Sequence, residues 1–150
     1  ALVERNYEAP ITTARHLAEQ REISPFTRMA LIFQACRNSS AAFLKTQPST
    51  TKAAPERAFL HQKYMNHLIV SLKPVLASII EQGIAQDLIR CADPVSLAEI
   101  VLIVLTVKMD NTLVPSTADE IEQTISALVS LLEKGTENPV GSLNFLMAQL

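Results

Sequence analysis

The segment from residue 95 to residue 111, VSLAEIVLIVLTVKMDN, constrains the fold of this chain more strongly than any other. On a helix that turns about 100° per residue, four of its polar positions share one narrow stripe, which Ile103 interrupts: Ser96, Glu99, Thr106 and Asp110. Nearly all of the remaining circumference is apolar. Burying one large aliphatic side chain contributes about 1.5–3 kcal/mol, and a typical domain is stable by only about 5–15 kcal/mol. The segment must therefore be covered on most sides.

Two arrangements would cover such a helix. It can be the hydrophobic centre of a monomeric bundle, or it can meet the same helix of a second copy across a twofold axis. The β-branched run IVLIVLTV also permits a buried strand, but Asp93-Pro94 is typical of a helix start, and strands usually stop at about 4–8 residues. The next segment, 118–133, is also amphipathic, so we predict a homodimer through these two helices. Its predicted interface residues are Leu97, Val101, Leu105, Ile121, Ile125, Leu128 and Leu132.

The composition of the whole chain indicates the all-α class. Only three Gly occur, no Asn-Gly or Asp-Gly hairpin signal is present, and helix-favouring residues dominate. A length of 150 residues suits one domain with its own core. We therefore predict a single domain over residues 1–150, built as an antiparallel bundle of about six to seven helices.

Apolar periodicity and capping residues predict where the individual helices lie. Their expected ranges are about 2–20, 25–38, 55–84, 95–111, 118–133 and 141–150. Pro10 should kink the first helix or mark a restart, Ser39 and Ser40 should end the second or add a short turn, and Pro74 should bend the third. Residues 47–55, QPSTTKAAP, should form an exposed loop. Thr117 and Glu120 form a capping-box pattern before the fifth helix.

Charge and cysteine usage exclude several classes of protein. The net charge of −2 arises from 13 basic and 15 acidic residues without a basic cluster, so this chain alone should not bind nucleic acid. Cys36 and Cys91 lie outside any C-x-x-C spacing and suit free thiols in a reducing cytoplasm. The longest unbroken apolar run, 100–105, is too short to cross a membrane, so no membrane partner is expected. The start at Ala1 without Met suggests that residues upstream are missing.

Sequence motifs of enzymes are absent. The chain has no H-E-x-x-H, E-x-x-H, G-x-S-x-G, P-loop or G-x-G-x-x-G pattern. His16, His61 and His67 have no carboxylate at metal-ligand spacing on the same helix face. We therefore expect no enzymatic activity, no metal site and no cofactor.

Residues 80–102, IEQGIAQDLIRCADPVSLAEIVL, resemble the sensor domains of the TetR/AcrR family of transcriptional regulators, which often carry an "EQGIAEGxFR … DP … A" passage. In that family a bent long helix leads into this turn, and the next two helices form a four-helix bundle with those of a second subunit. Asp87 stands where glycine is common, while Leu88-Ile89-Arg90 keeps the apolar-then-basic pattern. The family's N-terminal helix-turn-helix has no counterpart in residues 1–150, so DNA binding is implied only for the intact parent protein.

The resemblance implies the sensing and homodimerisation domain of a cytoplasmic regulator, a repressor that a small, largely apolar effector releases from DNA. The alternative is a standalone helical-bundle module for protein–protein interaction, without a small-molecule pocket. A helical enzyme is a more distant third possibility.

The resemblance also implies a ligand cavity between the first helix, the second helix and the long bent helix. Candidate ligand-binding residues project from the inner faces of two helices: Met29, Phe33, Cys36, His61, Tyr64, Met65 and Leu68. Each could equally be ordinary core, because apolar stripes build any helical bundle. The polar tips of His61 and Tyr64 need a partner if buried, which can be a ligand, a water or a neighbouring side chain. A bend at Pro74 could couple ligand binding to the angle between subunits.

Overall fold

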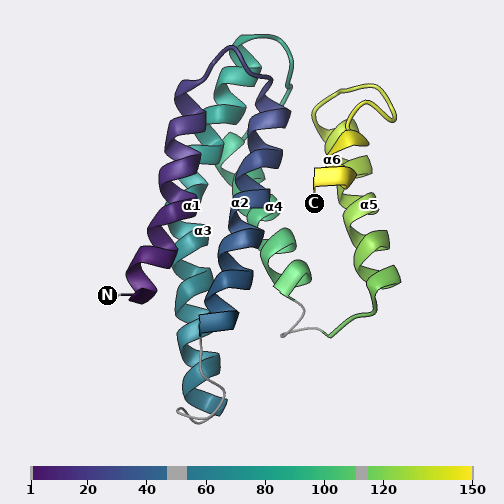
Figure 1. Cartoon of the computed structure of the whole chain (residues 1–150). Coiled ribbons are helices and arrows are strands. Elements are labelled where there is room, and N and C mark those ends of the chain that lie inside the picture. The colour runs from purple at the N-terminus through teal and green to yellow at the C-terminus, as the bar shows by residue number, and fades with distance from the viewer. Residues whose placement is uncertain (1, 47–53, 111–114, 150) are drawn as a thin grey trace.

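The structure, a computed structural model, describes residues 2–46, 54–110 and 115–149. Within these ranges the chain forms six helices and no strand, which confirms the all-α prediction (Figure 1). The helices are α1 Leu2–Glu19, α2 Pro25–Thr46, α3 Ala54–Ala85, α4 Pro94–Asp110, α5 Ala118–Gly135 and α6 Phe145–Gln149.

The first three helices pack against one another, and α4 lies along α3. Successive long helices run in opposite directions, and α5 stands to one side of the α1–α4 group with the short α6 near its end (Figure 1). α5 makes its main contacts with α4 and α6, and α6 also contacts α2. The chain is therefore a compact group of four helices with an α5–α6 unit laid against one edge.

Three predicted boundaries differ from the structure. α2 does not end near residue 38 but continues through Ser39 and Ser40 to Thr46, because serine inside a helix costs only a few tenths of a kcal/mol, on the order of 0.5, relative to alanine. α1 runs without interruption through Pro10, so no restart occurs there. α6 begins at Phe145 rather than at residue 141, since Gly141 has a φ of 85°, which is outside the helical region. Of the predicted loop 47–55, residues 47–53 lie outside the described residues.

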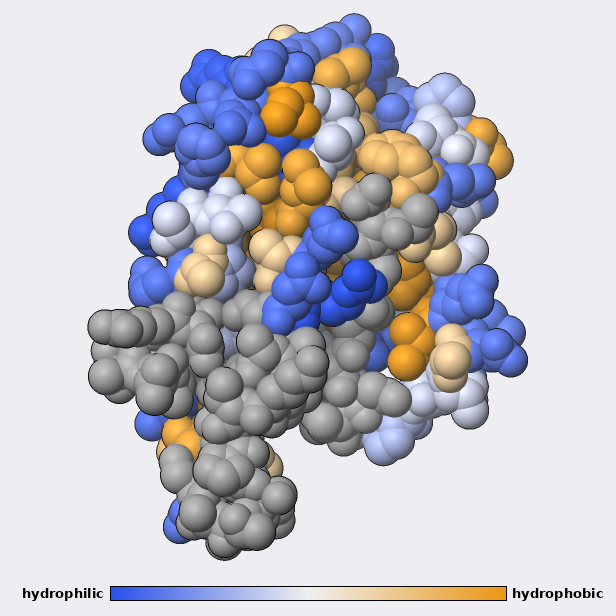
Figure 2. All heavy atoms as spheres, viewed as in Figure 1, coloured by the Kyte–Doolittle hydropathy of each residue, from blue (hydrophilic) through white to orange (hydrophobic). Residues whose placement is uncertain are grey.

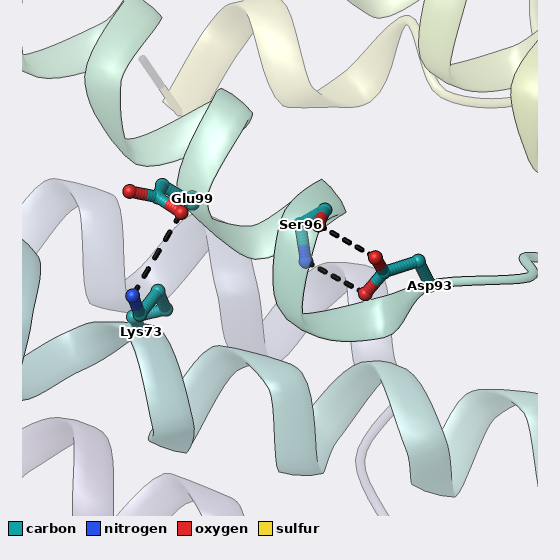
Figure 3. Close-up of polar contacts among 4 residues, drawn as sticks. All are labelled: Lys73, Asp93, Ser96 and Glu99. Atoms are coloured by element: carbon teal, nitrogen blue, oxygen red, sulfur yellow. Dashed lines mark hydrogen bonds and ion pairs between the residues drawn. The ribbon is translucent and has the colours of Figure 1, made fainter.

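The predicted starts of α4 and α5 are confirmed by their hydrogen bonds. At α5, the Thr117 hydroxyl accepts from the Glu120 amide at 3.2 Å, and the Glu120 carboxylate accepts from the Thr117 amide at 2.8 Å. At α4, the Asp93 carboxylate accepts from the Ser96 amide at 3.0 Å and from the Ser96 hydroxyl at 2.6 Å (Figure 3). These two bonds hold the pKa of Asp93 below its ordinary value. Both helices thus begin where capping chemistry satisfies their first amides.

The turn between α3 and α4 explains the departure at Asp87. Asp87 has a φ of 60°, in the left-handed region that glycine adopts without strain and that aspartate tolerates better than most residues. The amides of Leu88 and Ile89 donate to the Gly83 carbonyl at 2.9 and 3.2 Å, which closes the end of α3. The turn therefore keeps the geometry of a glycine-containing helix end although glycine is absent from that position.

One helical segment, Ala58–Ala85 of α3, is long and apolar enough to cross a membrane by length and composition alone. The segment contains no long unbroken apolar run, because lysine and other polar residues interrupt it. The same helix supplies Tyr64, Leu72 and Ile79, each 0% exposed, to the core formed with α1, α2 and α4. Interior packing uses part of this hydropathy, since 39% of the apolar window is buried.

Candidate functional site

A small, partly enclosed cavity lies where α2, α3 and α4 meet the α5–α6 unit, and we call it the seam cavity. Its volume is about 30 Å³. The described residues that line it are Phe26, Met29, Phe33, Leu76, Ile80, Ile89, Leu97, Ala98, Val101, Leu132, Thr136 and Leu146.

The walls of the seam cavity are apolar, and among the described lining residues only Thr136 carries a polar side chain. The Thr136 hydroxyl donates to the Leu132 carbonyl at 2.5 Å and accepts from the Asn138 amide nitrogen at 2.8 Å. Its hydrogen-bonding capacity is therefore used within the chain. A charged or strongly polar guest would lose its hydration here without gaining partners from these walls.

The candidate ligand-binding residues divide between the seam cavity and the packed core. Met29 and Phe33 line the cavity. Tyr64 is 0% exposed and Leu68 is 5% exposed, so both are ordinary members of the core. The remaining three lie beside that core: Cys36 and Met65 pack against it, and the His61 ring stacks on Tyr64 with 6.4 Å between ring centroids. The structure thus places five of the seven away from the seam cavity.

Most of the lining residues are not among the predicted ligand-binding residues, and three of them, Leu97, Val101 and Leu132, are among the predicted interface residues instead. Leu97, Ala98 and Val101 recur at spacings of one, three and four residues, the pattern of an inward-facing stripe. Leu132 and Thr136 are similarly spaced on α5, and both reach the cavity. The sequence therefore contains the apolar spacing of these lining residues. Because α4 is apolar on most sides, however, the spacing does not show which side faces the cavity and which faces a neighbouring helix.

The predicted interface residues mostly hold α5 onto α4 within one chain. Val101, Leu105, Ile125 and Leu128 form a second apolar cluster and are at most 8% exposed. The other three are half-buried beside that cluster: Leu97, Ile121 and Leu132. Because α5 lies against α4, these four side chains are buried within the subunit.

Other apolar side chains of α4 and α5 remain exposed after the two helices have covered each other. Ile100 is 55% exposed and Ile103 is 43% exposed on α4, and Leu131 is 67% exposed on α5. We call these three residues the outer face. Hydrophobic residues also reach the surface in other places, and Figure 2 shows several of them, in orange, on one side of the molecule. Near the outer face, Lys73 Nζ of α3 forms an ion pair with Glu99 Oε2 of α4 at a distance of 3.7 Å (Figure 3).

A buried arginine closes the end of α1. Arg28 is 0% exposed, and its Nη1 donates to the carbonyls of Leu17 and Ala18 at 3.4 and 3.3 Å and to Gln82 Oε1 at 2.7 Å. A cation at a helix C-terminus is favourable because the last carbonyls carry partial negative charge. Burial lowers the pKa of Arg28. The residue is a structural cap that the sequence analysis did not identify.

No group of three or more His, Cys, Asp or Glu residues in the described ranges is arranged to hold a metal ion. The two features of the described residues that bear on function are the seam cavity and the outer face. They define a class: a helical domain with an apolar internal cavity and unpaired apolar side chains on two adjacent helices.

Comparison with known families identifies the class more closely. Residues 44–131 match the family model described as "Tetracyclin repressor-like, C-terminal domain", and the chain belongs to this family. The resemblance found at residues 80–102 is thereby confirmed. No curated protein and no solved structure matches the chain. Domains of this family are non-enzymatic regulatory domains that generally dimerise and bind effectors.

Proposed function

We propose that residues 1–150 form one domain that senses an effector and homodimerises within a cytoplasmic TetR-type regulator. In this proposal the regulator is a repressor, and a small, largely apolar effector releases it from DNA. DNA is bound by a separate N-terminal domain of the parent protein, and no membrane is involved. The observation that carries the proposal is the outer face of Ile100, Ile103 and Leu131 on the last two long helices.

The packing of α4 supports self-association. One side of α4 is covered by the core through Ala98 and Leu102, and another by α5 through Val101 and Leu105. Ile100 and Ile103 lie on a third side that no part of the described chain buries. A second copy would cover this side with its own outer face, because a twofold axis brings the same patch of both subunits together.

The seam cavity supports the sensing role. Six of its twelve described lining residues lie within the range that matches the family model, and its surface is apolar. Small-molecule sites in proteins are concave and mostly apolar. Its small volume, about 30 Å³, favours a second candidate function, a helical interaction module without a small-molecule pocket.

Oligomeric state tests the proposed interface. Sedimentation equilibrium of the wild-type chain should give a dimer at micromolar concentration. Ile103→Glu and Leu131→Glu should each raise the dimer dissociation constant by about 100-fold or more, since a buried unpaired charge costs several kcal/mol and 1.4 kcal/mol is a factor of ten. Val140→Glu is the matched control, because Val140 is 88% exposed and belongs to neither α4 nor α5. A wild-type monomer at these concentrations contradicts homodimerisation.

A thermal-shift screen tests sensing independently of the interface. Hydrophobic drugs, fatty acyl compounds and aromatic metabolites are incubated with the wild-type chain. A ligand that binds only the folded state raises the melting temperature, because it stabilises that state by RT ln(1 + [L]/Kd). If no compound of these classes shifts the melting temperature while the dimer forms, the interaction module becomes the better description.

A further inference from the structure

The seam cavity is bounded by two parts of the chain that differ in how firmly they are held. One wall belongs to α2, α3 and α4, which lie within the four-helix group. The opposite wall is formed by Leu132 and Thr136 near the end of α5 and by Leu146 of α6. α5 makes its main contacts with only two helices, α4 and α6, and stands apart from α1 and α3 (Figure 1). Movement of α5 would therefore enlarge the cavity. It would also displace Val129, which belongs to the same buried cluster as Tyr64, and lengthen the hydrogen bonds that join Thr136 and Asn138 to the α3–α4 turn.

The chemistry of the walls limits what the cavity can hold. Aromatic and aliphatic side chains meet there from five helices, for example Phe33, Ile80 and Leu146. The single hydroxyl, on Thr136, is engaged with Leu132 and Asn138. A carboxylate or ammonium group would be desolvated without a partner, whereas a neutral apolar molecule would replace empty space by contacts.

The volume of the cavity sets a scale for the guest. At about 30 Å³ the cavity is no larger than the space of one or two small molecules such as water. Apolar cavities of this kind stay dry, and one of about 150 Å³ admits benzene. Met29 on the wall is an unbranched, flexible side chain that can repack. A modest outward shift of α5 together with repacking of Met29 would provide room for a single ring.

Two larger hollows on the surface suit such a guest less well. One, of about 570 Å³, is lined by Arg15, Glu19 and Arg21, and the other, of about 530 Å³, by Asp119 and Glu122 among others. Both are open to solvent and bordered by charged side chains. An apolar molecule would remain largely hydrated in either one.

We propose that the seam cavity is the effector site and that it takes a neutral, apolar molecule of about the size of one aromatic ring, admitted by movement of α5. The proposal rests on the proposed sensing function and assigns to it a site, a ligand class and a moving element. The site differs from the one expected beside His61 and Tyr64, because the side chains there pack into the core.

Toluene and benzoate are the probes that test the ligand class, since they share a ring and differ in charge. Calorimetric titration of the wild-type chain should give toluene binding in the millimolar range or tighter and at least tenfold weaker binding of benzoate. Equal binding of the two would overturn the assigned class. Absence of toluene binding would overturn the proposal, while the broader thermal-shift screen would still decide whether the chain senses any ligand.

Two variants test the site. Ala98 lines the cavity and Ala77 does not, although both are buried, at 1% and 3% exposed. Ala98→Val should weaken toluene binding at least tenfold, whereas Ala77→Val should leave it within about twofold of wild type. Leu132→Ala, which enlarges the cavity, should tighten toluene binding and provides a readout if Ala98→Val fails to fold. Unchanged toluene affinity in both Ala98→Val and Leu132→Ala would overturn the assignment of the site, even if an effector from the screen still bound.

Discussion

Leu131 and Leu132 are consecutive residues of α5 that face different surroundings. Leu131 is 67% exposed on the outer face, while Leu132 lines the seam cavity. One turn earlier, Ala127 is exposed and Leu128 is buried against α4. A shift of α5 that opens the cavity must therefore also move the outer face. Cavity and proposed interface share one rigid element.

The first prediction is that toluene binding and dimerisation are thermodynamically linked. Saturating toluene should change the dimer dissociation constant of the wild-type chain by about threefold or more, because the position of α5 affects both equilibria. Because each dimer holds two toluene sites, linkage requires that the per-site toluene affinities of monomer and dimer differ by the square root of that factor. Sedimentation equilibrium with and without toluene measures the effect.

Leu131→Glu provides the control for this linkage. As a monomer it should bind toluene with an affinity that does not depend on protein concentration, whereas the wild-type affinity should vary across the dimer transition. An identical dimer dissociation constant with and without toluene would show that α5 does not connect the two sites.

The second prediction concerns two glycines that differ in their surroundings. A Cβ added at Gly83 would lie 2.5 Å from Ile89 Cδ1 and 3.2 Å from Pro25 Cγ, whereas one added at Gly135 would meet nothing within 4 Å. Gly83→Ala should lower the free energy of unfolding by about 1–2 kcal/mol, because overpacking outweighs the better helix propensity of alanine. Gly135→Ala should be neutral or slightly stabilising. Urea denaturation measures both, and equal effects would contradict the close packing at Gly83.

The third prediction concerns the capping box of α5. Thr117→Ala removes the side chain that accepts from the Glu120 amide and should lower the free energy of unfolding by about 1 kcal/mol. Ser130→Ala, an exposed position within α5, should change it by less than about 0.5 kcal/mol. The measurement is urea denaturation at constant protein concentration. A Thr117→Ala variant as stable as wild type would mean that α5 does not depend on its cap.

Helix ends that are marked by capping residues could be predicted from the sequence. Thr117 with Glu120 and Asp93 with Pro94 mark the starts of α5 and α4, because few arrangements other than a helix N-terminus use these residues in this order. The end of α2 could not be predicted from Ser39 and Ser40, since serine weakly disfavours a helix without terminating it. Capping residues specify a boundary, whereas propensity alone does not.

The periodicity of the sequence could not show which side of α4 packs against which neighbouring helix. Leu105 and Ile103 are both apolar, but one is buried against α5 and the other is exposed. Which stripe faces a neighbouring helix depends on where α5 lies against α4, and this is a property of the tertiary structure. The same holds for Arg28, whose role becomes visible only when α3 brings Gln82 to the end of α1.

The fourth prediction concerns the thiol of Cys36. Burial raises the pKa of Cys36 from its ordinary 9.0 to about 12, because the thiolate would be desolvated among apolar side chains. At pH 8 a thiol reagent should therefore modify Cys36 more slowly in the folded chain than after unfolding. Since the folded state keeps the Cys36 proton that the unfolded state loses, stability should be fully present below pH 9 and decline as the pH rises toward 12. Thermal melts across this range measure the decline, and Cys36→Ala should reduce it. Rapid labelling of Cys36 in a Cys91→Ser variant would contradict a buried, protonated thiol.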